Sequence, residues 1–328
     1  MKDLRPPLAS PAVWRSGDVA DPAKWTWRLS RAERQAIVSA AGRARAAGRT
    51  TATLELGDFD LPVLRPGVTA WVEALLRGQG FILLRDFPLE ELTPFEIELA
   101  YVGLGLQLGT PVGQDADATL LGHVRDEGMA RNDPGVRLYR TNKRQDFHTD
   151  GSDIVGLLCL AKARSGGESR IASSLGVYNE ILHRRPDLLE VLYEPMFWDR
   201  NDEQSKGEDP YFSLPVLNDV AGAPRFFYIG WYIRDAQRHP QVPRLTEAQE
   251  EAMTLIEGIA NDPDYYLEMD FEPGDIQLLA NATILHCREE FVDHSEADRR
   301  RHLLRLWLTA HDSASVDDVL RGGIPKRK

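Results

Sequence analysis

The run IVGLLCLA occupies residues 154–161, and KARSGGESRIAS continues the chain to residue 173. A continuous apolar run of this length, flanked by turn residues, is typical of a buried strand. Ser165-Gly-Gly167 has the composition of a tight turn, and Arg170–Ser173 again has the pattern of a strand. This stretch therefore predicts two consecutive strands separated by a short turn.

Similar short runs recur on both sides of this stretch. The further expected strands are Thr51–Leu56, Phe81–Leu84, Val136–Tyr139, Arg225–Ile233, Tyr265–Phe271, Asp275–Leu279 and Arg301–Leu308. Helices are expected at residues 31–48, 69–77, 93–104, 174–184 and 246–260, two of them opening with a capping box. Many short strands with few helices predict a mainly β fold with flanking helices, a β-sandwich or jelly roll, and argue against a doubly wound sheet.

Composition narrows the class of protein. The chain has 328 residues and a net charge of −12, which disfavours a nucleic-acid partner because a negative field repels phosphate backbones. Its 2 cysteines cannot form a disulfide framework and suit a reducing compartment. No apolar stretch has the length of a membrane span, and the N-terminus lacks a signal-peptide core. We therefore expect a cytoplasmic protein without a membrane partner, and a homo-oligomer stays open.

We find no linker that divides the chain, so residues 1–328 are expected to form a single domain. Residues 1–30 are rich in Pro and Trp and predict an arm that lies over the surface. The segment at about 199–215 begins with DRNDEQSKGEDP, the most polar stretch of the chain. It predicts a long loop, and a lid over a site is the functional interpretation of that loop.

The most informative histidine is His148, in the sequence Gln145-Asp-Phe-His148-Thr-Asp150. On an extended segment, residues two apart point to the same side, so His148 and Asp150 can bind one ion together. A second histidine would complete the two-histidine, one-carboxylate set of non-haem Fe(II) oxygenases. His286 follows an apolar strand, as expected of a ligand beside a cleft, although a core histidine bonded to a carbonyl fits that segment equally well.

Two arginines lie on the last predicted strand. Arg301, Leu303 and Arg305 share one face of it, and a guanidinium on an apolar strand is costly to bury without an anion. A guanidinium fork binds a carboxylate through two parallel hydrogen bonds. We therefore favour an anion-binding role for Arg301 and Arg305.

Three of these segments, His148-Thr-Asp150, Asn281-Ala-Thr-Ile-Leu-His286 and Arg301-His-Leu-Leu-Arg305, together resemble motifs of one family. This is the taurine dioxygenase-like (TauD/TfdA) group of Fe(II)- and 2-oxoglutarate-dependent oxygenases, to which clavaminate synthase is related. The resemblance covers roughly residues 70 to 310 and includes Gly166-Gly-Glu-Ser169. It implies a double-stranded β-helix, a jelly roll with flanking helices.

The resemblance also implies roles for individual residues. His148, Asp150 and His286 would bind Fe(II), and Arg301 with Ser169 would bind the distal carboxylate of 2-oxoglutarate. Arg305 would face the substrate or share the co-substrate role, and the sequence does not decide between these two. The implied reaction consumes O2 and releases succinate and CO2, with hydroxylation of a C–H bond as the usual outcome and desaturation or ring closure as alternatives.

The substrate is defined only by class. Arg140, Lys143 and Arg144 precede the metal motif and together favour a small polar or anionic molecule, such as an amino acid or another carboxylate. Tyr139, Asn142 and Gln145 lie near the same edge and are candidate pocket residues. Two rival functions stay open, namely a Zn(II)-dependent hydrolase built on the same three ligands and a non-catalytic jelly roll that binds a small ligand.

Overall fold

The computed structural model describes residues 5–115, 117–129, 136–204, 206–220 and 222–311. Its larger sheet has seven strands, with β4 (Leu121–Val124) paired to β17 beside the main order. That order is β1 (Thr26–Arg28), β2 (Phe81–Arg85), β14 (Ile276–Ala280), β6 (Ile154–Ala161), β17 (His302–Ala310) and β3 (Gly109–Pro111). The predicted central strand at 154–161 is thus confirmed.

The smaller sheet has four strands, in the order β13 (Tyr266–Met269), β8 (Ser169–Ser173), β15 (Ile284–Arg288) and β5 (Gln145–His148). Three two-stranded ribbons complete the described strands: β7 (Ser165–Gly166) with β16 (Phe291–Val292), β9 (Pro195–Asp199) with β10 (Tyr211–Pro215), and β11 (Leu217–Val220) with β12 (Ala223–Phe226).

Seven α-helices are described: α1 (Arg31–Ala46), α2 (Arg65–Leu76), α3 (Pro94–Gly105), α4 (Ser174–Arg184), α5 (Pro186–Val191), α6 (Gly230–Asp235) and α7 (Glu247–Ala260). Capping boxes begin α3 at Thr93 and α7 at Thr246, as the sequence predicts. In each box the threonine hydroxyl accepts a hydrogen bond from the main-chain N–H three residues later.

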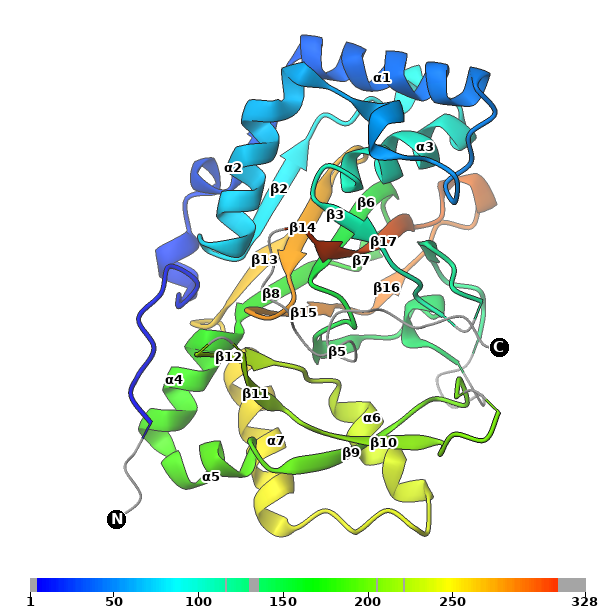
Figure 1. The fold of residues 1–328 in the computed structure, drawn as a ribbon. Coiled ribbons are helices and arrows are strands. Elements are labelled where there is room, and N and C mark those ends of the chain that lie inside the picture. Colours follow the sequence, from blue (N-terminus) through cyan, green and yellow to red (C-terminus); the bar gives the residue numbers. More distant parts are fainter. Residues whose placement is uncertain (1–4, 116, 130–135, 205, 221, 312–328) are drawn as a thin grey trace.

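The elements are arranged in layers (Figure 1). One apolar cluster joins α1, α2 and α3 to the outer face of the larger sheet, through residues such as Leu84, Leu158 and Leu304. A second joins α4, α5 and α7 to the outer face of the smaller sheet, through Ala172 and Leu285. A third fills the space between the two sheets. This arrangement confirms the predicted mainly β jelly roll with flanking helices.

Alternation along the strands decides which side chains enter the space between the sheets. On β17, Leu304 and Leu306 join the outer cluster, whereas Leu303 joins the inner one. On β15, Leu285 lies in the outer cluster and Ile284 in the inner one. Every second residue of each strand therefore lines the interior of the sandwich.

Three predicted strands are wrong. Thr51–Leu56 contains a turn and no strand, and a 3-10 helix begins at Leu56. Val136–Tyr139 ends in a 3-10 helix at Leu138–Arg140. Arg225–Ile233 is a strand only up to Phe226, and α6 begins at Gly230. Between them the main chain of Tyr228 pairs with Thr149, whose N–H donates to its carbonyl over 2.8 Å. An apolar run reports burial, and it cannot distinguish a strand from a buried loop or helix.

The boundaries of the predicted arm and loop also change. The arm does more than lie over the surface, because its residues 26–28 form β1, which pairs in parallel with β2. The expected lid segment includes residues of a hairpin, since Asp199 ends β9 and Tyr211–Pro215 forms β10. The connection itself spans only residues 200–210, and Glu203 within it pairs with Arg137.

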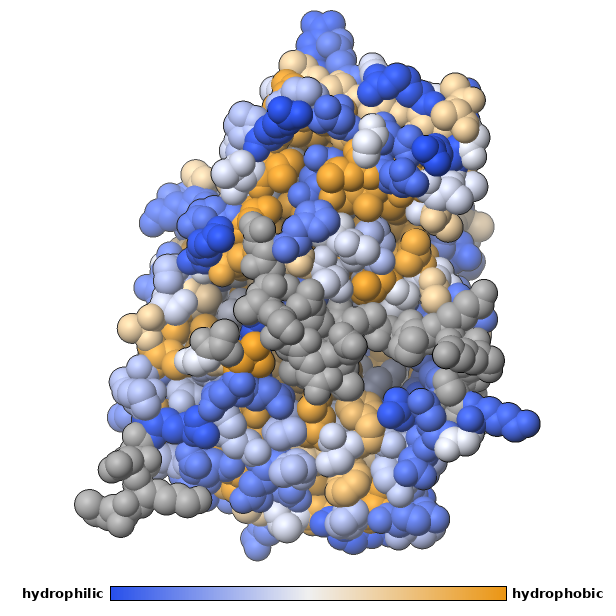
Figure 2. Space-filling view, viewed as in Figure 1, coloured by the Kyte–Doolittle hydropathy of each residue, from blue (hydrophilic) through white to orange (hydrophobic). Residues whose placement is uncertain are grey.

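None of the described helices combines the length and the apolar character needed to span a bilayer. On the face seen in Figure 2, hydrophilic side chains cover most of the upper and lower rims, and apolar ones gather in the recesses between them. Among the described residues, the large apolar side chains that are exposed are Leu56, Val63, Phe95 and Val292.

Candidate active site

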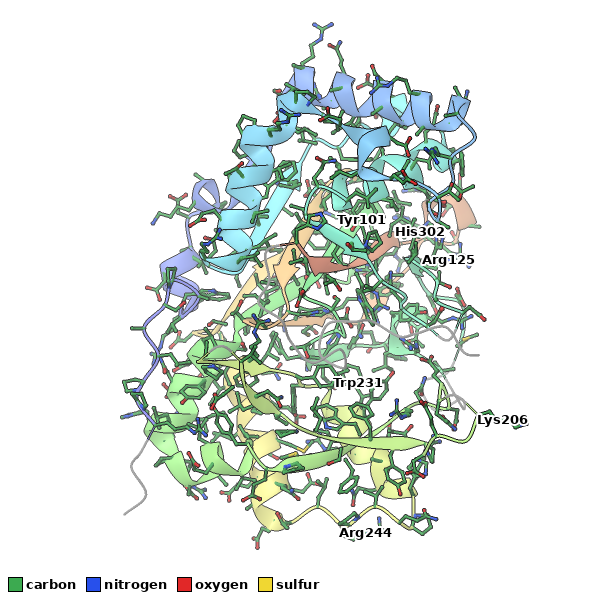
Figure 3. All side chains as sticks on the ribbon, in the orientation of Figure 1. Tyr101, Arg125, Lys206, Trp231, Arg244 and His302 are labelled. Carbon is green, nitrogen blue, oxygen red and sulfur yellow. The ribbon has the colours of Figure 1, made fainter. Side chains whose placement is uncertain are left out.

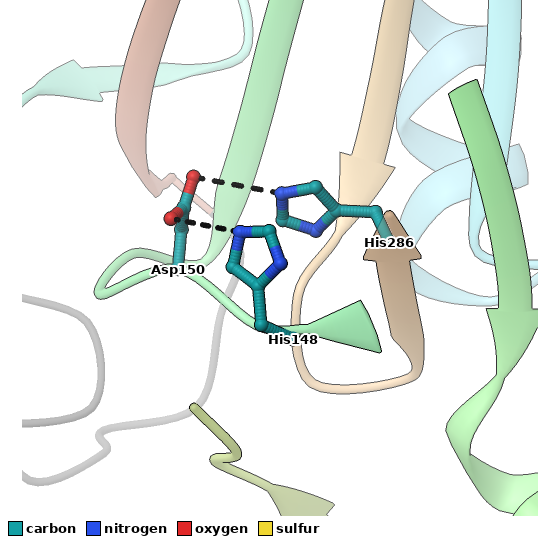
Figure 4. A group of neighbouring side chains, drawn as sticks. All are labelled: His148, Asp150 and His286. Carbon is teal, nitrogen blue, oxygen red and sulfur yellow. Dashed lines mark ion pairs between the residues drawn. The ribbon is translucent and has the colours of Figure 1, made fainter. Parts of the chain in front are cut away.

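Three predicted ligand residues meet at one end of the space between the sheets (Figure 4). His148 ends β5 and His286 lies on β15, and the two residues are direct partners in the antiparallel register. Asp150 follows β5, so its carboxylate lies beside both rings. One candidate ligand atom from each of the three side chains lies within 4.8 Å of the others.

The distances fit a common ion. Nε2 of His148 and Nε2 of His286 each lie 3.8 Å from a carboxylate oxygen of Asp150. Nδ1 of His148 donates to the carbonyl of Asp146 over 2.7 Å, which leaves Nε2 of that ring as the ligand atom. Nδ1 of His286 is buried and has no hydrogen-bond partner among the described residues. This set of two imidazoles and one carboxylate suits Fe(II) and leaves coordination positions open.

The carboxylate of Asp150 is held by neighbours from the opposite sheet. Nε1 of Trp307 donates to its Oδ2 over 2.9 Å, and Nη1 of Arg305 lies 3.4 Å from the same oxygen. Burial alone would raise the pKa of Asp150, but the positive charge of Arg305 and the hydrogen bond from Trp307 oppose burial, and the pKa of Asp150 is lowered. Asp150 is therefore an anion at neutral pH, ready to bind a cation.

The main chain around Asp150 is fixed by one buried amide side chain, Asn281. Its Oδ1 accepts from the N–H of Asp150 over 3.1 Å, and its Nδ2 donates to the carbonyls of Asp150 and Ser152 over 3.1 and 2.8 Å. Asn281 follows β14 of the larger sheet, so these bonds tie the ligand loop to the opposite layer.

Burial keeps both imidazoles neutral. It lowers the pKa of His148, and together with the neighbouring His148 ring it lowers the pKa of His286 to about 3. A neutral imidazole has a free lone pair for a metal. The indole of Trp231 covers His148, with ring centroids 5.0 Å apart, and Figure 3 shows it between the sandwich and the β9–β10 hairpin.

A pocket leads from the two imidazoles into the sandwich. Its lining includes His148, His286, Ser169 and three arginines, Arg288, Arg301 and Arg305. Burial lowers the pKa of Arg301 to about 10, and burial with the nearby Arg301 charge lowers the pKa of Arg288 to about 9. A pocket that holds several buried guanidiniums has the charge needed to bind an organic anion.

The other predicted site residues are placed as follows. Ser169 lines the pocket, and its Oγ donates to Gln277 Oε1 over 3.1 Å. Tyr139 and Gln145 also line it, with Gln145 Nε2 3.0 Å from Nε2 of His148. Asn142 is not among the lining residues, and its carbonyl instead accepts from the N–H of Phe291 over 3.1 Å.

The basic cluster that suggested an anionic substrate belongs to the surface. Each member pairs with a carboxylate outside the pocket, namely Arg140 with Glu127, Lys143 with Glu290 and Arg144 with Glu289. Ion pairs of this kind are solvated and carry little free energy. The buried arginines of the pocket, and not this basic cluster, therefore support an anionic ligand.

Sequence reasoning missed three residues of this site, Arg288, Trp307 and Gln114, and it favoured a core position for Trp231 over a place in the wall of the pocket. Gln114 Oε1 accepts from Nε of Arg305 over 2.7 Å and comes from a distant loop. The sequence could have indicated Arg288, because Arg288 lies two residues after His286 on an apolar strand and therefore shares the face of His286. Trp307 could have been predicted in the same way, because it is the next residue after Arg305 on the inward face of the strand.

Comparisons with known proteins agree with this geometry. The model of the family described as "Taurine catabolism dioxygenase TauD, TfdA family" matches residues 45–307. FR-33289 synthase of Streptomyces rubellomurinus is 33% identical over 314 residues, which cover 94% of this chain and 92% of the relative. A taurine hydroxylase-like protein of Stachybotrys chartarum is 32% identical, covering 81% of this chain and 69% of the relative.

Solved structures share the fold at lower identity. An asparagine oxygenase in complex with Fe(II), 3-hydroxyasparagine and succinate has a TM-score of 0.68 and 17% identity, and the match covers 87% of this chain and 94% of that one. The non-haem iron oxygenase OrfP in complex with Fe and α-ketoglutaric acid has a TM-score of 0.62 and 17% identity, with the same coverage.

The family match extends over most of the chain, and the three candidate ligands lie within the matched residues. Family membership decides against the zinc hydrolase and the non-catalytic jelly roll. The chain belongs to the TauD/TfdA family and is an Fe(II)- and 2-oxoglutarate-dependent oxygenase.

Proposed function

We propose that His148, Asp150 and His286 bind the iron and that the enzyme hydroxylates a C–H bond of a small polar or anionic molecule. The observation that carries this assignment is the convergence of their three ligand atoms within 4.8 Å, with both imidazoles lining a pocket that also contains three arginines. When bound, Fe(II), 2-oxoglutarate and O2 supply the oxidation. One oxygen atom enters the substrate as hydroxyl, and the other enters succinate as CO2 is released.

Arg305 lies on β17 and Arg301 directly precedes it, and the two arginines take different roles in this proposal. Nη2 of Arg301 lies 3.4 Å from the carbonyl of Gly167, close to Ser169, so Arg301 binds the distal carboxylate of 2-oxoglutarate. Arg305 lies beside the metal ligands, where its Nη1 is 3.4 Å from Oδ2 of Asp150 and its Nη2 has no hydrogen-bond partner among the residues that the structure describes. That free donor beside the iron ligands faces the substrate.

The substrate class rests on this free donor and on the relatives. One structural neighbour holds 3-hydroxyasparagine, another holds (3S)-hydroxy-L-Arg, and a curated relative is a uridine-5'-phosphate dioxygenase of Amycolatopsis. Each of these molecules carries an anionic group that a guanidinium binds. We therefore propose that the substrate is an amino acid or another small carboxylate, and that it binds beside Tyr139 and Gln145. We also propose a cytoplasmic location for the enzyme.

The assignment is tested with Asp150→Ala and a control, Asp146→Ala, whose side chain is partly exposed and pairs with Arg144. Asp150→Ala is expected to lose bound Fe(II) and substrate-dependent succinate formation, because the imidazoles alone leave the metal without its anionic ligand. Asp146→Ala is expected to keep both. Full turnover by Asp150→Ala, or turnover with Zn(II) in the absence of 2-oxoglutarate, would contradict the proposal.

A further inference from the structure

Arg288 is a buried cation that points into the pocket. Leu285 and Cys287 of β15 pack in the outer cluster, whereas Ile284 packs between the sheets. Strand alternation therefore turns Arg288 inward, on the same face as His286. Its side chain is only 6% exposed and lines the same pocket as both imidazoles.

The hydrogen bonds of Arg288 leave most of its fork free. Its Nη2 donates to the carbonyls of Leu138 and Lys143, whereas its Nε and Nη1 have no hydrogen-bond partner in the part of the chain that the structure describes. Arg301 is similar, because its Nη2 lies 3.4 Å from the Gly167 carbonyl and its Nη1 has no hydrogen-bond partner among the described residues. Within the same residues neither arginine forms an ion pair with a carboxylate, and neutral carbonyls do not balance a buried charge.

Both guanidiniums line the same pocket as Ser169. Both lie over the ring of Phe291, with Cζ to centroid distances of 5.0 Å for Arg288 and 5.1 Å for Arg301. In the smaller sheet Arg288 is the direct partner of Ser169. This pocket therefore carries two positive charges and one hydroxyl in addition to Arg305.

We propose that Arg288 is a second guanidinium of the clamp that holds the distal carboxylate of 2-oxoglutarate, beside Arg301 and Ser169. This inference rests on the proposed function and adds a residue that selects the co-substrate. An oxo acid without a distal carboxylate leaves both buried cations unpaired, so the clamp discriminates against such acids.

A purely structural role is the competing explanation. Nη2 of Arg288 holds the segment that carries Tyr139 and Gln145, so loss of Arg288 would disturb the whole pocket. The two roles differ in one measurable respect. A disturbed pocket weakens every oxo acid alike, whereas a lost clamp weakens only those with a distal carboxylate.

The test compares two ligands under anaerobic conditions. Fe(II)-loaded protein is titrated with 2-oxoglutarate and with 2-oxobutyrate, which has the same chelating end and no distal carboxylate. The metal-to-ligand charge-transfer band reports binding of each. The variants are Arg288→Met and Arg288→Lys, and the control is Lys143→Met, which removes one nearby positive charge from an exposed ion pair.

For Arg288→Met we expect 2-oxoglutarate to bind about 10- to 100-fold more weakly, the effect of losing a charge-assisted hydrogen bond. We expect the affinity for 2-oxobutyrate to change by less than about threefold. Arg288→Lys keeps the charge without the fork and should give an intermediate loss for 2-oxoglutarate, which also serves as the test if the methionine variant does not fold. Lys143→Met should match the unmodified protein.

Equal weakening of both ligands, or an unchanged affinity for 2-oxoglutarate, would overturn the role of Arg288. Failure of the proposed function gives a different result, because unmodified protein would then show no charge-transfer band with Fe(II) and 2-oxoglutarate.

Discussion

Replacing Trp307 by phenylalanine tests whether the larger sheet orients the metal ligand. The indole N–H of Trp307 donates to Oδ2 of Asp150 over 2.9 Å, and phenylalanine keeps an aromatic ring while removing this donor. The carboxylate is buried, so water cannot readily replace the bond. We expect Trp307→Phe to weaken Fe(II) binding without abolishing it.

The magnitude follows from the neighbours of that oxygen. A hydrogen bond to a charged group contributes about 1.5–3 kcal/mol. Nη1 of Arg305 also approaches Oδ2, at 3.4 Å, and compensates part of the loss. We therefore expect the lower end of the range, about 1.5 kcal/mol, which corresponds to about tenfold weaker Fe(II) binding.

The assay is anaerobic competition for Fe(II) against a chromophoric chelator. Trp71→Phe is the matched control, because Trp71 is fully buried in the helix-side core and its Nε1 has no hydrogen-bond partner. This control loses the same side-chain volume without losing a bond to the site. An unchanged affinity in Trp307→Phe, or an equal loss in Trp71→Phe, would refute the reasoning.

Two further predictions concern stability and the ligand loop. Asn281→Ala removes the hydrogen bonds to Asp150 and Ser152 and leaves buried main-chain groups unpaired. We therefore expect the free energy of unfolding, measured by denaturant titration, to fall by about 2–4 kcal/mol, and Fe(II) to bind more weakly. An Asn281→Ala variant with unchanged stability would contradict this. Gly103→Ala places a methyl group 2.3 Å from the ring of Phe59. We therefore expect the free energy of unfolding to fall by about 1–3 kcal/mol in the same titration, with the affinity for Fe(II) unchanged. An unchanged free energy of unfolding would contradict this prediction.

Much of the fold could be predicted because local sequence patterns indicate many of its helices and strands. The apolar runs at residues 81–84 and 154–161 and the capping boxes at Thr93 and Thr246 predicted elements that the structure confirms. These signals are short-range, since they depend on hydrogen bonds and burial within a few residues. The failures at Val136–Tyr139 and Arg225–Ile233 arise where an apolar segment is buried without pairing along its whole length.

The candidate site divides in the same way. The sequence by itself determined that His148 and Asp150 share one side of an extended segment, and that Arg301 and Arg305 share one face of a strand, because the period of a strand is two residues. It did not determine what lies across from these faces. Only the tertiary structure decided that His286 pairs with His148, that Trp307 and Arg305 of the opposite sheet contact Asp150, and that Arg288 and Arg301 line one pocket. The physical reason is that register and sheet packing are set by contacts between residues far apart in the chain, which no local pattern records.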